Sequence, residues 1–123
     1  GGPLLVTPNT NPAVIARGVQ KAMTVMPAFY TPSEGFLALA AGARYLKLFP
    51  AATGGIDHLK AMLAVLPGDV AVYAVGGVGA GNMREWKAAG AKGFGLGSDL
   101  FKPDFTDAEI AARARKCVAA FRG

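Results

Sequence analysis

The sequence predicts an α/β fold in which a parallel sheet is built from repeated strand–helix units. Short apolar runs alternate with helical segments five times over 123 residues. The runs start about 20 to 25 residues apart, which is the length of a compact strand–loop–helix–loop unit. Helical crossovers return the chain in the same direction, so consecutive strands run parallel. A repeat supports the unit: Ala40-Ala41-Gly42-Ala43 recurs as Ala88-Ala89-Gly90-Ala91, each closing a helix and opening a strand.

The expected strands are the short apolar runs. They cover Leu4–Thr7, Thr24–Met26, Tyr45–Phe49, Val70–Val75 and Gly93–Leu96. The helices expected between and after them cover Pro12–Lys21, Pro32–Ala41, Ile56–Val65, Asn82–Ala89 and Asp107–Phe121. Five units are too few for a barrel of eight. The pattern leaves two architectures open, a five-stranded open sheet or a chain that starts in the middle of a barrel.

Capping residues mark the ends of these helices. Asn11 and Thr31 each precede a proline, which suits the first helical position. Thr106 opens a capping-box sequence, Thr-x-x-Glu. Gly42 and Gly90 follow two helices, where a left-handed residue is needed.

Composition limits the classes of protein. The chain is 52% hydrophobic and 17% charged, and no run of 18 apolar residues predicts a membrane span. No basic-then-apolar signal peptide is present, and the single cysteine excludes an internal disulfide and fits a reducing compartment. We expect a cytoplasmic protein.

The net charge of +5 admits nucleic acid, an anionic surface or a phosphorylated substrate as partner. The basic residues are scattered, apart from a cluster at Arg113–Lys116 late in a helix, where positive charge complements the helix dipole. Aromatic and basic residues do not interleave as a single-strand binding platform requires. The distribution favours a phosphorylated small molecule over nucleic acid.

Lys47 is the main candidate for covalent chemistry. Side chains alternate along a strand, so Tyr45, Lys47 and Phe49 share one face, and Leu46 and Leu48 the other. If the leucines pack under helices, Lys47 points into a barrel interior, where desolvation lowers its pKa. The free amine can then attack a ketone carbonyl and form an iminium ion. The alternative is an edge strand whose lysine faces water.

Two glycine turns predict a phosphate site. Gly76 and Gly77 follow the fourth expected strand, and Gly97 and Ser98 follow the fifth. Glycines allow close backbone approach, and the amides that open the next helix can bind an anion. In (β/α)8 barrels the loops after the last two strands commonly form the phosphate site. The run Gly76–Gly81 does not match G-x-G-x-x-G, so no dinucleotide cofactor is expected.

The remaining reactive residues suggest packing and capping. His58 lies near the start of a helix beside Asp57, where a surface or capping role is expected, and Cys117 lies on an apolar helix face. One histidine and one cysteine cannot assemble the common zinc ligand sets. We therefore expect no metal and no cofactor.

In order and spacing, four segments resemble the 2-keto-3-deoxy-6-phosphogluconate/galactonate aldolase family: Val6–Asn9, Leu46–Pro50, Val75–Val78 and Gly95–Leu100. The resemblance implies a (β/α)8 TIM barrel in which residues 1–123 are the C-terminal part of a single domain, units four to eight. It also implies a homotrimer that reversibly cleaves a phosphorylated 2-keto-3-deoxy sugar acid to pyruvate and glyceraldehyde 3-phosphate.

The resemblance assigns roles by position. Lys47 is the Schiff-base residue. Gly76, Gly77, Gly97 and Ser98 would hold the phosphate, and Pro8, Phe49 and Val75 would line the pocket. Val75 stands where gluconate-type enzymes have threonine, which favours 6-phosphogalactonate over 6-phosphogluconate.

The family's first three units, with its glutamate general base and an active-site arginine, have no counterpart in these residues. A non-catalytic phosphate-binding half-barrel and a flavodoxin-like protein therefore remain alternatives. The latter needs a phosphate loop after the first strand, where Thr7–Pro12 lacks glycine. In this chain alone, we expect Lys47 to be hydrated and its pKa nearly normal.

Overall fold

The computed structural model describes residues 2–123 and confirms the α/β class with parallel strands. The strands are β1 (Leu4–Val6), β2 (Thr24–Met26), β3 (Ala28–Phe29), β4 (Tyr45–Leu48), β5 (Ala71–Val75) and β6 (Gly93–Gly95). The helices are α1 (Pro12–Gln20), α2 (Pro32–Ala40), α3 (Ala51–Val65), α4 (Met83–Ala88) and α5 (Asp107–Arg122). In the described part of the chain, no helix is long and apolar enough to cross a membrane.

The strands lie side by side in the order of the chain. β1 pairs with β2, and β3, β4, β5 and β6 form a second parallel row. The break between the rows lies at Pro27, which has no N–H to donate. Its carbonyl accepts a hydrogen bond from Lys47 N at 2.9 Å, and Thr7 O accepts one from Ala28 N at 3.2 Å, so β1 and β4 flank this segment on its two sides. β3 was not expected from the sequence.

This sequential order excludes one of the alternatives left open, the flavodoxin-like protein. A flavodoxin-like sheet has the order 2-1-3-4-5, with its second strand outside the first. The observed order has no such crossover, so the flavodoxin-like alternative is wrong. Sequential parallel strands are the arrangement found in (β/α)8 barrels.

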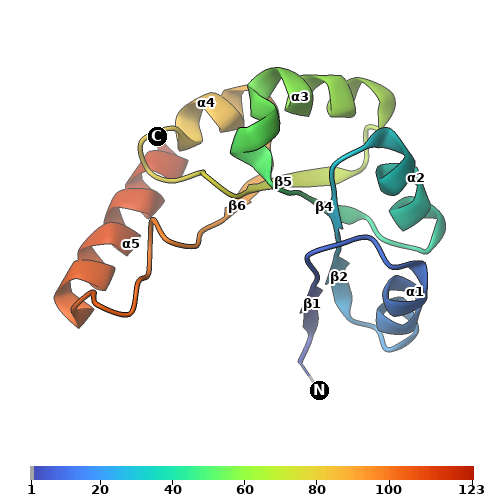
Figure 1. Cartoon of the computed structure of the whole chain (residues 1–123), viewed down its shortest axis with the longest axis horizontal. Helices are drawn as coiled ribbons and strands as arrows, with labels where there is room; N and C mark the ends of the chain where they lie inside the picture. Colours follow the sequence, from blue (N-terminus) through green and yellow to red (C-terminus); the bar gives the residue numbers. More distant parts are fainter. Residues whose placement is uncertain (1) are drawn as a thin grey trace.

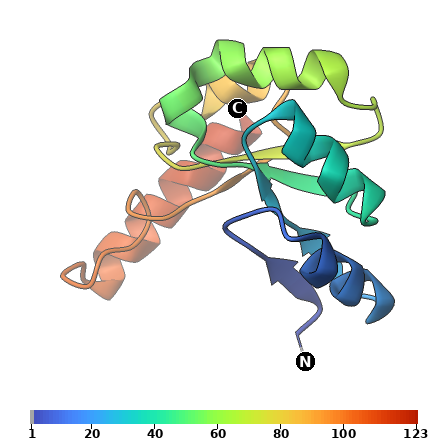
Figure 2. The same cartoon turned by 45° about the vertical axis from the view of Figure 1, so that its right-hand side comes forward.

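The helices lie on one side of the strands, outside the turn that the strands make from β1 to β6 (Figure 1). The turned view again places α1, α2 and α3 on that side (Figure 2). The core lies between the two layers, where Leu46, Leu48 and Val72 of the sheet and Ile15 and Leu59 of the helices are fully buried. These helices do not cover the opposite face of the sheet, which carries the side chain of Lys47.

The capping predictions largely hold. The Asn11 side chain accepts from two amides of α1, and Thr31 forms a reciprocal capping box with Glu34. Gly42 and Gly90 are left-handed, with φ of 107° and 114°. The Thr106 side chain accepts a hydrogen bond from the Glu109 amide. The Glu109 carboxylate does not complete the capping box, because it accepts a hydrogen bond from Arg113 of the same helix instead.

α3 differs most from the expected boundaries. It begins at Ala51 instead of Ile56, because the chain turns helical directly after β4. Gly55 interrupts it with φ 80° and ψ 177°, a conformation that other residues rarely adopt. The expected helix is therefore the second part of α3, and its first turn brings Ala52 against the loop that follows β5.

Candidate functional site

A cavity of about 620 Å³ opens beyond the carboxyl ends of β4, β5 and β6. It is lined by most of the predicted site residues, namely Phe49, Val75, Gly76, Gly77, Gly97 and Ser98. The carboxyl ends of parallel strands are where ligands bind in α/β proteins. The structure therefore brings the two glycine turns to one cavity, as the sequence predicted.

Gly76 and Gly77 shape the loop after β5. Their φ values are 97° and 70°, which strain any residue with a β-carbon. A β-carbon at Gly77 would overlap that of Ala52, and one at Gly76 would lie 3.3 Å from the Phe49 ring. Ala52 N donates to Gly76 O at 3.0 Å, so this loop lies directly against the first turn of α3. Both glycines are required by the path of the backbone.

Gly97 has a different environment. Nothing lies within 4 Å of the place where its β-carbon would stand, and its φ is not in the left-handed range. Its carbonyl accepts from Leu100 N and Phe101 N, both at 3.0 Å, which folds the loop after β6 into a turn. Gly97 and Ser98 are exposed, so this turn presents its backbone and the Ser98 hydroxyl to the cavity.

Lys47 lies on the face of β4 opposite the helices. It is half-buried, whereas Leu46 and Leu48 beside it are fully buried toward the core. Ala28 of β3 and Tyr73 of β5 flank it. The predicted alternation is confirmed, and the edge-strand alternative is wrong because β4 has a neighbour on each side.

Burial lowers the pKa of Lys47 below the ordinary lysine value. The direction is downward because the neighbouring strands and the Phe49 ring, 5.5 Å from Nζ, remove part of the water from the ammonium group. A lowered pKa leaves more of the side chain as free amine at a given pH. That is the form that can attack a carbonyl carbon.

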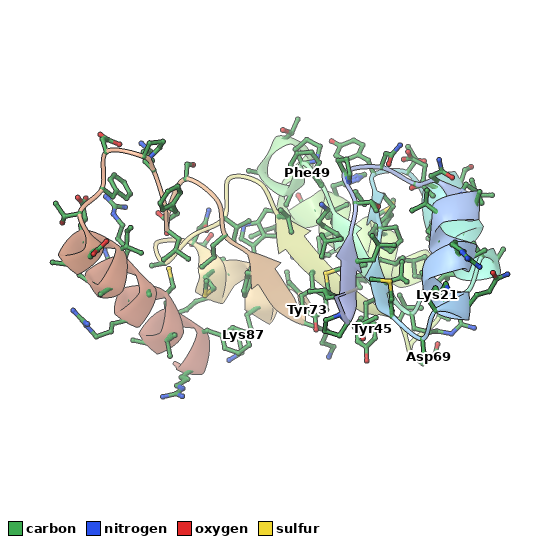
Figure 3. The ribbon with its side chains drawn as sticks, turned by 90° about the horizontal axis from the view of Figure 1, so that it is seen from below. Lys21, Tyr45, Phe49, Asp69, Tyr73 and Lys87 are labelled. Atoms are coloured by element: carbon green, nitrogen blue, oxygen red, sulfur yellow. The ribbon has the colours of Figure 1, made fainter. Side chains whose placement is uncertain are left out.

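Aromatic side chains surround Lys47 on the same open face. Phe49 lies at one end of this face, and Tyr45 and Tyr73 lie together at the other (Figure 3). The two tyrosine rings meet edge to face, with centroids 6.4 Å apart. Tyr45 and Phe49 are 43% and 40% exposed, which is high for large apolar rings. The inner face of the described sheet is therefore an incompletely covered apolar surface.

Pro8 is not brought into the cavity. It is exposed, directly after β1, in a turn closed by a hydrogen bond of 2.8 Å from Thr7 Oγ1 to Asn9 O. Thr7 lies beside Ala28, which in turn pairs with Lys47. Pro8 is thus at the same end of the sheet as the cavity, on the far side of β3 from Lys47.

The structure adds polar residues that sequence reasoning missed. Asn82 closes the loop after β5, because its Oδ1 accepts from Gly79 N and its Nδ2 donates to Gly77 O, both at 3.0 Å. Asp99, Lys102 and Arg113 also line the cavity.

The position of Arg113 in the basic cluster Arg113–Lys116 predicts only an interaction with the helix dipole. Instead it is half-buried, lies 3.2 Å from Glu109, and stacks with its guanidinium carbon 4.2 Å from the centre of the Phe105 ring. Lys102 Nζ lies 5.7 Å from the centre of the same ring. Two cations therefore border the cavity. In the sequence, the one indication of this is that both residues follow the last glycine turn.

His58 and Cys117 have packing roles. His58 Nε2 lies 2.7 Å from Tyr30 O, and its ring stacks on that of Tyr30 at 4.5 Å, so it joins α3 to the end of β3 instead of facing solvent. Cys117 is buried as expected, and burial, with the nearby Asp99 carboxylate, raises the pKa of its thiol. Among residues 2–123, no three His, Cys, Asp or Glu side chains gather as metal ligands.

Comparison with known proteins gives consistent matches over nearly the whole chain. The sequence model of the KDPG and KHG aldolase family matches residues 1–117. The chain is 46% identical over 121 residues to the probable 2-dehydro-3-deoxy-6-phosphogalactonate aldolase of Rhizobium meliloti (strain 1021), covering 98% of this chain and 57% of that protein. It is 47% identical over 122 residues to the 2-dehydro-3-deoxy-6-phosphogalactonate aldolase of Escherichia coli (strain K12), covering 99% and 60%.

A solved structure described as native KDPGal superimposes with a TM-score of 0.95 at 47% identity, covering 98% of this chain and 58% of that one. The chain therefore spans about three fifths of the length of the curated relatives it matches.

Proposed function

Because the chain belongs to the KDPG and KHG aldolase family, we propose that it is the C-terminal part of a class I aldolase domain with a (β/α)8 barrel. Residues 1–123 would supply the last five units of that barrel. The sequential parallel order supports this, since a barrel adds one strand after another around its axis. The remaining two fifths of the relatives' length would hold the preceding units and cover the inner face.

The proposed reaction is the reversible cleavage of 2-keto-3-deoxy-6-phosphogalactonate to pyruvate and D-glyceraldehyde 3-phosphate. The observation that carries it is the half-buried Lys47, with its lowered pKa, on a strand paired on both sides and two residues before Phe49, which lines the cavity. Its amine attacks the C2 ketone, and water leaves as the iminium forms. A base removes the C4 hydroxyl proton, the C3–C4 bond breaks, and its electrons pass into the iminium to give an enamine. Protonation at C3 and hydrolysis then release pyruvate.

The phosphate would lie between the two glycine turns, held by Gly76, Gly77, Gly97 and Ser98, with Lys102 and Arg113 adding positive charge at the cavity border. Phe49 and Val75 would line the path from Lys47, whereas Pro8 lies outside the cavity lining, after β1. By the family resemblance, the general base and an active-site arginine come from the preceding units. We further propose a cytoplasmic homotrimer that needs no cofactor.

The substrate proposal is tested by measuring pyruvate release from both C4 epimers by the complete barrel. We expect faster turnover of the galactonate epimer, because Val75 offers no hydrogen bond to a sugar hydroxyl. Val75→Thr should raise activity on the gluconate epimer several-fold, within the range of one hydrogen bond. Pyruvate release from neither epimer would favour the non-catalytic phosphate-binding half-barrel.

The phosphate proposal is tested by Gly97→Ala. The added methyl group meets no protein atom, so the fold should be unaffected, but the group would occupy space beside the anion. We expect KM for glyceraldehyde 3-phosphate, in aldol addition to pyruvate, to rise about fivefold or more, with little change for unphosphorylated glyceraldehyde. Gly68→Ala is the matched control, since it too has open space but lies outside the cavity lining. Equal KM changes for both aldehydes would place the phosphate elsewhere.

A further inference from the structure

Asp99 joins the segments around the cavity. Its carboxylate Oδ2 accepts a hydrogen bond of 3.2 Å from Ala80 N, in the loop that follows β5. Its own backbone carbonyl accepts one of 3.1 Å from Arg113, and Cys117 Sγ lies 3.7 Å from the same Oδ2. Asp99 itself follows Gly97 and Ser98. One residue therefore connects the loop after β5, the loop after β6 and helix α5.

Gly79 provides the space for this contact. A β-carbon at Gly79 would overlap the Asp99 carboxylate, and its three nearest atoms would all belong to that group. The φ of Gly79 is not in the left-handed range, so the backbone conformation itself does not require glycine. Position 79 is instead suited to glycine because the Asp99 carboxylate occupies the space that a β-carbon would need. The loop after β5 is thus shaped to receive the carboxylate from the loop after β6.

A carboxylate in this position is electrostatically costly if the cavity holds a phosphate. Asp99 lines the same cavity as both glycine turns, and like charges repel. Its hydrogen bond from Ala80 N and its contact with Cys117 direct Oδ2 toward the protein, while Lys102 and Arg113 line the same cavity. Asp99 is therefore unsuited to be a phosphate ligand, and its contacts are those of a group that fixes the positions of others.

We propose that Asp99 is a positioning residue for phosphate recognition, which sets the distance between the two glycine turns by holding Ala80 N against the loop after β6. The inference rests on the proposed phosphate site and adds a determinant of its geometry. Asp99 acts through the loops and has no contact with the reacting carbon atoms. Its loss should widen the site for the phosphate while leaving the chemistry at Lys47 intact.

The first test compares Asp99→Ala with Asp99→Asn in the complete barrel. Asp99→Ala should raise KM for glyceraldehyde 3-phosphate about tenfold, the effect expected of one lost hydrogen bond. The kcat and the KM for unphosphorylated glyceraldehyde should change less than about twofold, because Lys47 is untouched. Asp99→Asn keeps an acceptor oxygen for Ala80 N and should restore most of the wild-type KM. Equal losses on both aldehydes, or an asparagine variant as impaired as the alanine variant, would overturn the proposal.

The second test is a double-mutant cycle with Gly79→Ala. On its own, this methyl group should push the carboxylate off Ala80 N and raise KM for the phosphorylated aldehyde as Asp99→Ala does. In the Asp99→Ala background the methyl group has room, so Gly79→Ala should add less than about twofold. Additive effects would show that the two residues act separately and would overturn the proposal.

The same measurements separate this inference from the proposed function. If the wild-type protein does not prefer phosphorylated over unphosphorylated aldehyde, the phosphate site itself is wrong. If it does prefer the phosphorylated aldehyde but Asp99→Ala and Gly79→Ala keep that preference, only the role of Asp99 is wrong. Should Asp99→Ala fail to fold, Asp99→Asn and Gly79→Ala still decide, because a folded Gly79→Ala variant with an unchanged KM contradicts the proposal.

Discussion

Lys47→Arg is expected to abolish aldol cleavage by the complete barrel, lowering kcat by roughly 10⁴-fold or more, as loss of a covalent nucleophile does in other enzymes. The guanidinium stays protonated at any working pH and cannot form an imine with the substrate ketone. A lysine amine can lose its proton and do so, and burial lowers the pKa of Lys47 below the ordinary lysine value. The measurement is pyruvate release from 2-keto-3-deoxy-6-phosphogalactonate at saturating substrate.

Lys60→Arg is the matched control for this variant. Lys60 lies on α3, with its side chain 61% exposed, and is not among the residues that line the cavity. The same substitution there should leave kcat unchanged. If Lys47→Arg kept more than about one hundredth of the wild-type kcat, another group would have to be the nucleophile.

The 123-residue chain without the preceding units is expected to release pyruvate at least about 100-fold more slowly than the complete barrel, the usual contribution of a general base. A separate fragment holding the missing units should restore part of the activity by closing the sheet. Pyruvate release with and without the fragment, together with the mass of the species in solution, tests this. Self-association of the chain alone is also expected, since β1 and β6 each pair on one side in residues 2–123.

Two glutamates of the described chain, Glu34 and Glu109, are held by other groups. Glu34 accepts hydrogen bonds from Tyr30 N at 3.1 Å and Thr31 N at 2.9 Å. Burial by itself raises the pKa of Glu34, but these hydrogen bonds outweigh it and lower the pKa below its ordinary value. Glu109 is paired with Arg113. Neither of these two carboxylates lines the cavity. A monomer of this chain with full turnover would contradict the proposed division of the active site.

The elements that follow from local sequence were predictable. Alternation with a period of two placed Lys47 opposite Leu46 and Leu48, because strand geometry alone fixes that pattern. The glycine turns after β5 and β6 were recognised because their residue types are tied to backbone conformation. β3 was missed because Pro27 suggests an end to the strand, whereas here it only divides it. The start of α3 was missed because Gly55 suggests a loop, yet it kinks a helix that is already formed.

The residues that the sequence did not reveal depend on tertiary packing. Arg113 reaches the cavity only because α5 lies against the loop that carries Asp99. Asp99 meets Ala80 because two loops from successive units come together, and neither loop carries a local signal for the other. The direction in which the pKa of Lys47 shifts has the same origin. Flanking strands desolvate it even though the inner face stays open.

The most direct test of Lys47 as the Schiff-base residue is to treat the complete barrel with pyruvate and borohydride and to map the modified peptide by mass spectrometry. Borohydride reduces the iminium to a stable secondary amine and so records which nitrogen formed it. We expect the adduct on the peptide that contains Lys47, and none on that peptide when borohydride is added without pyruvate. An adduct on Lys60 or Lys92 instead, or no pyruvate-dependent adduct at all, would contradict the assignment.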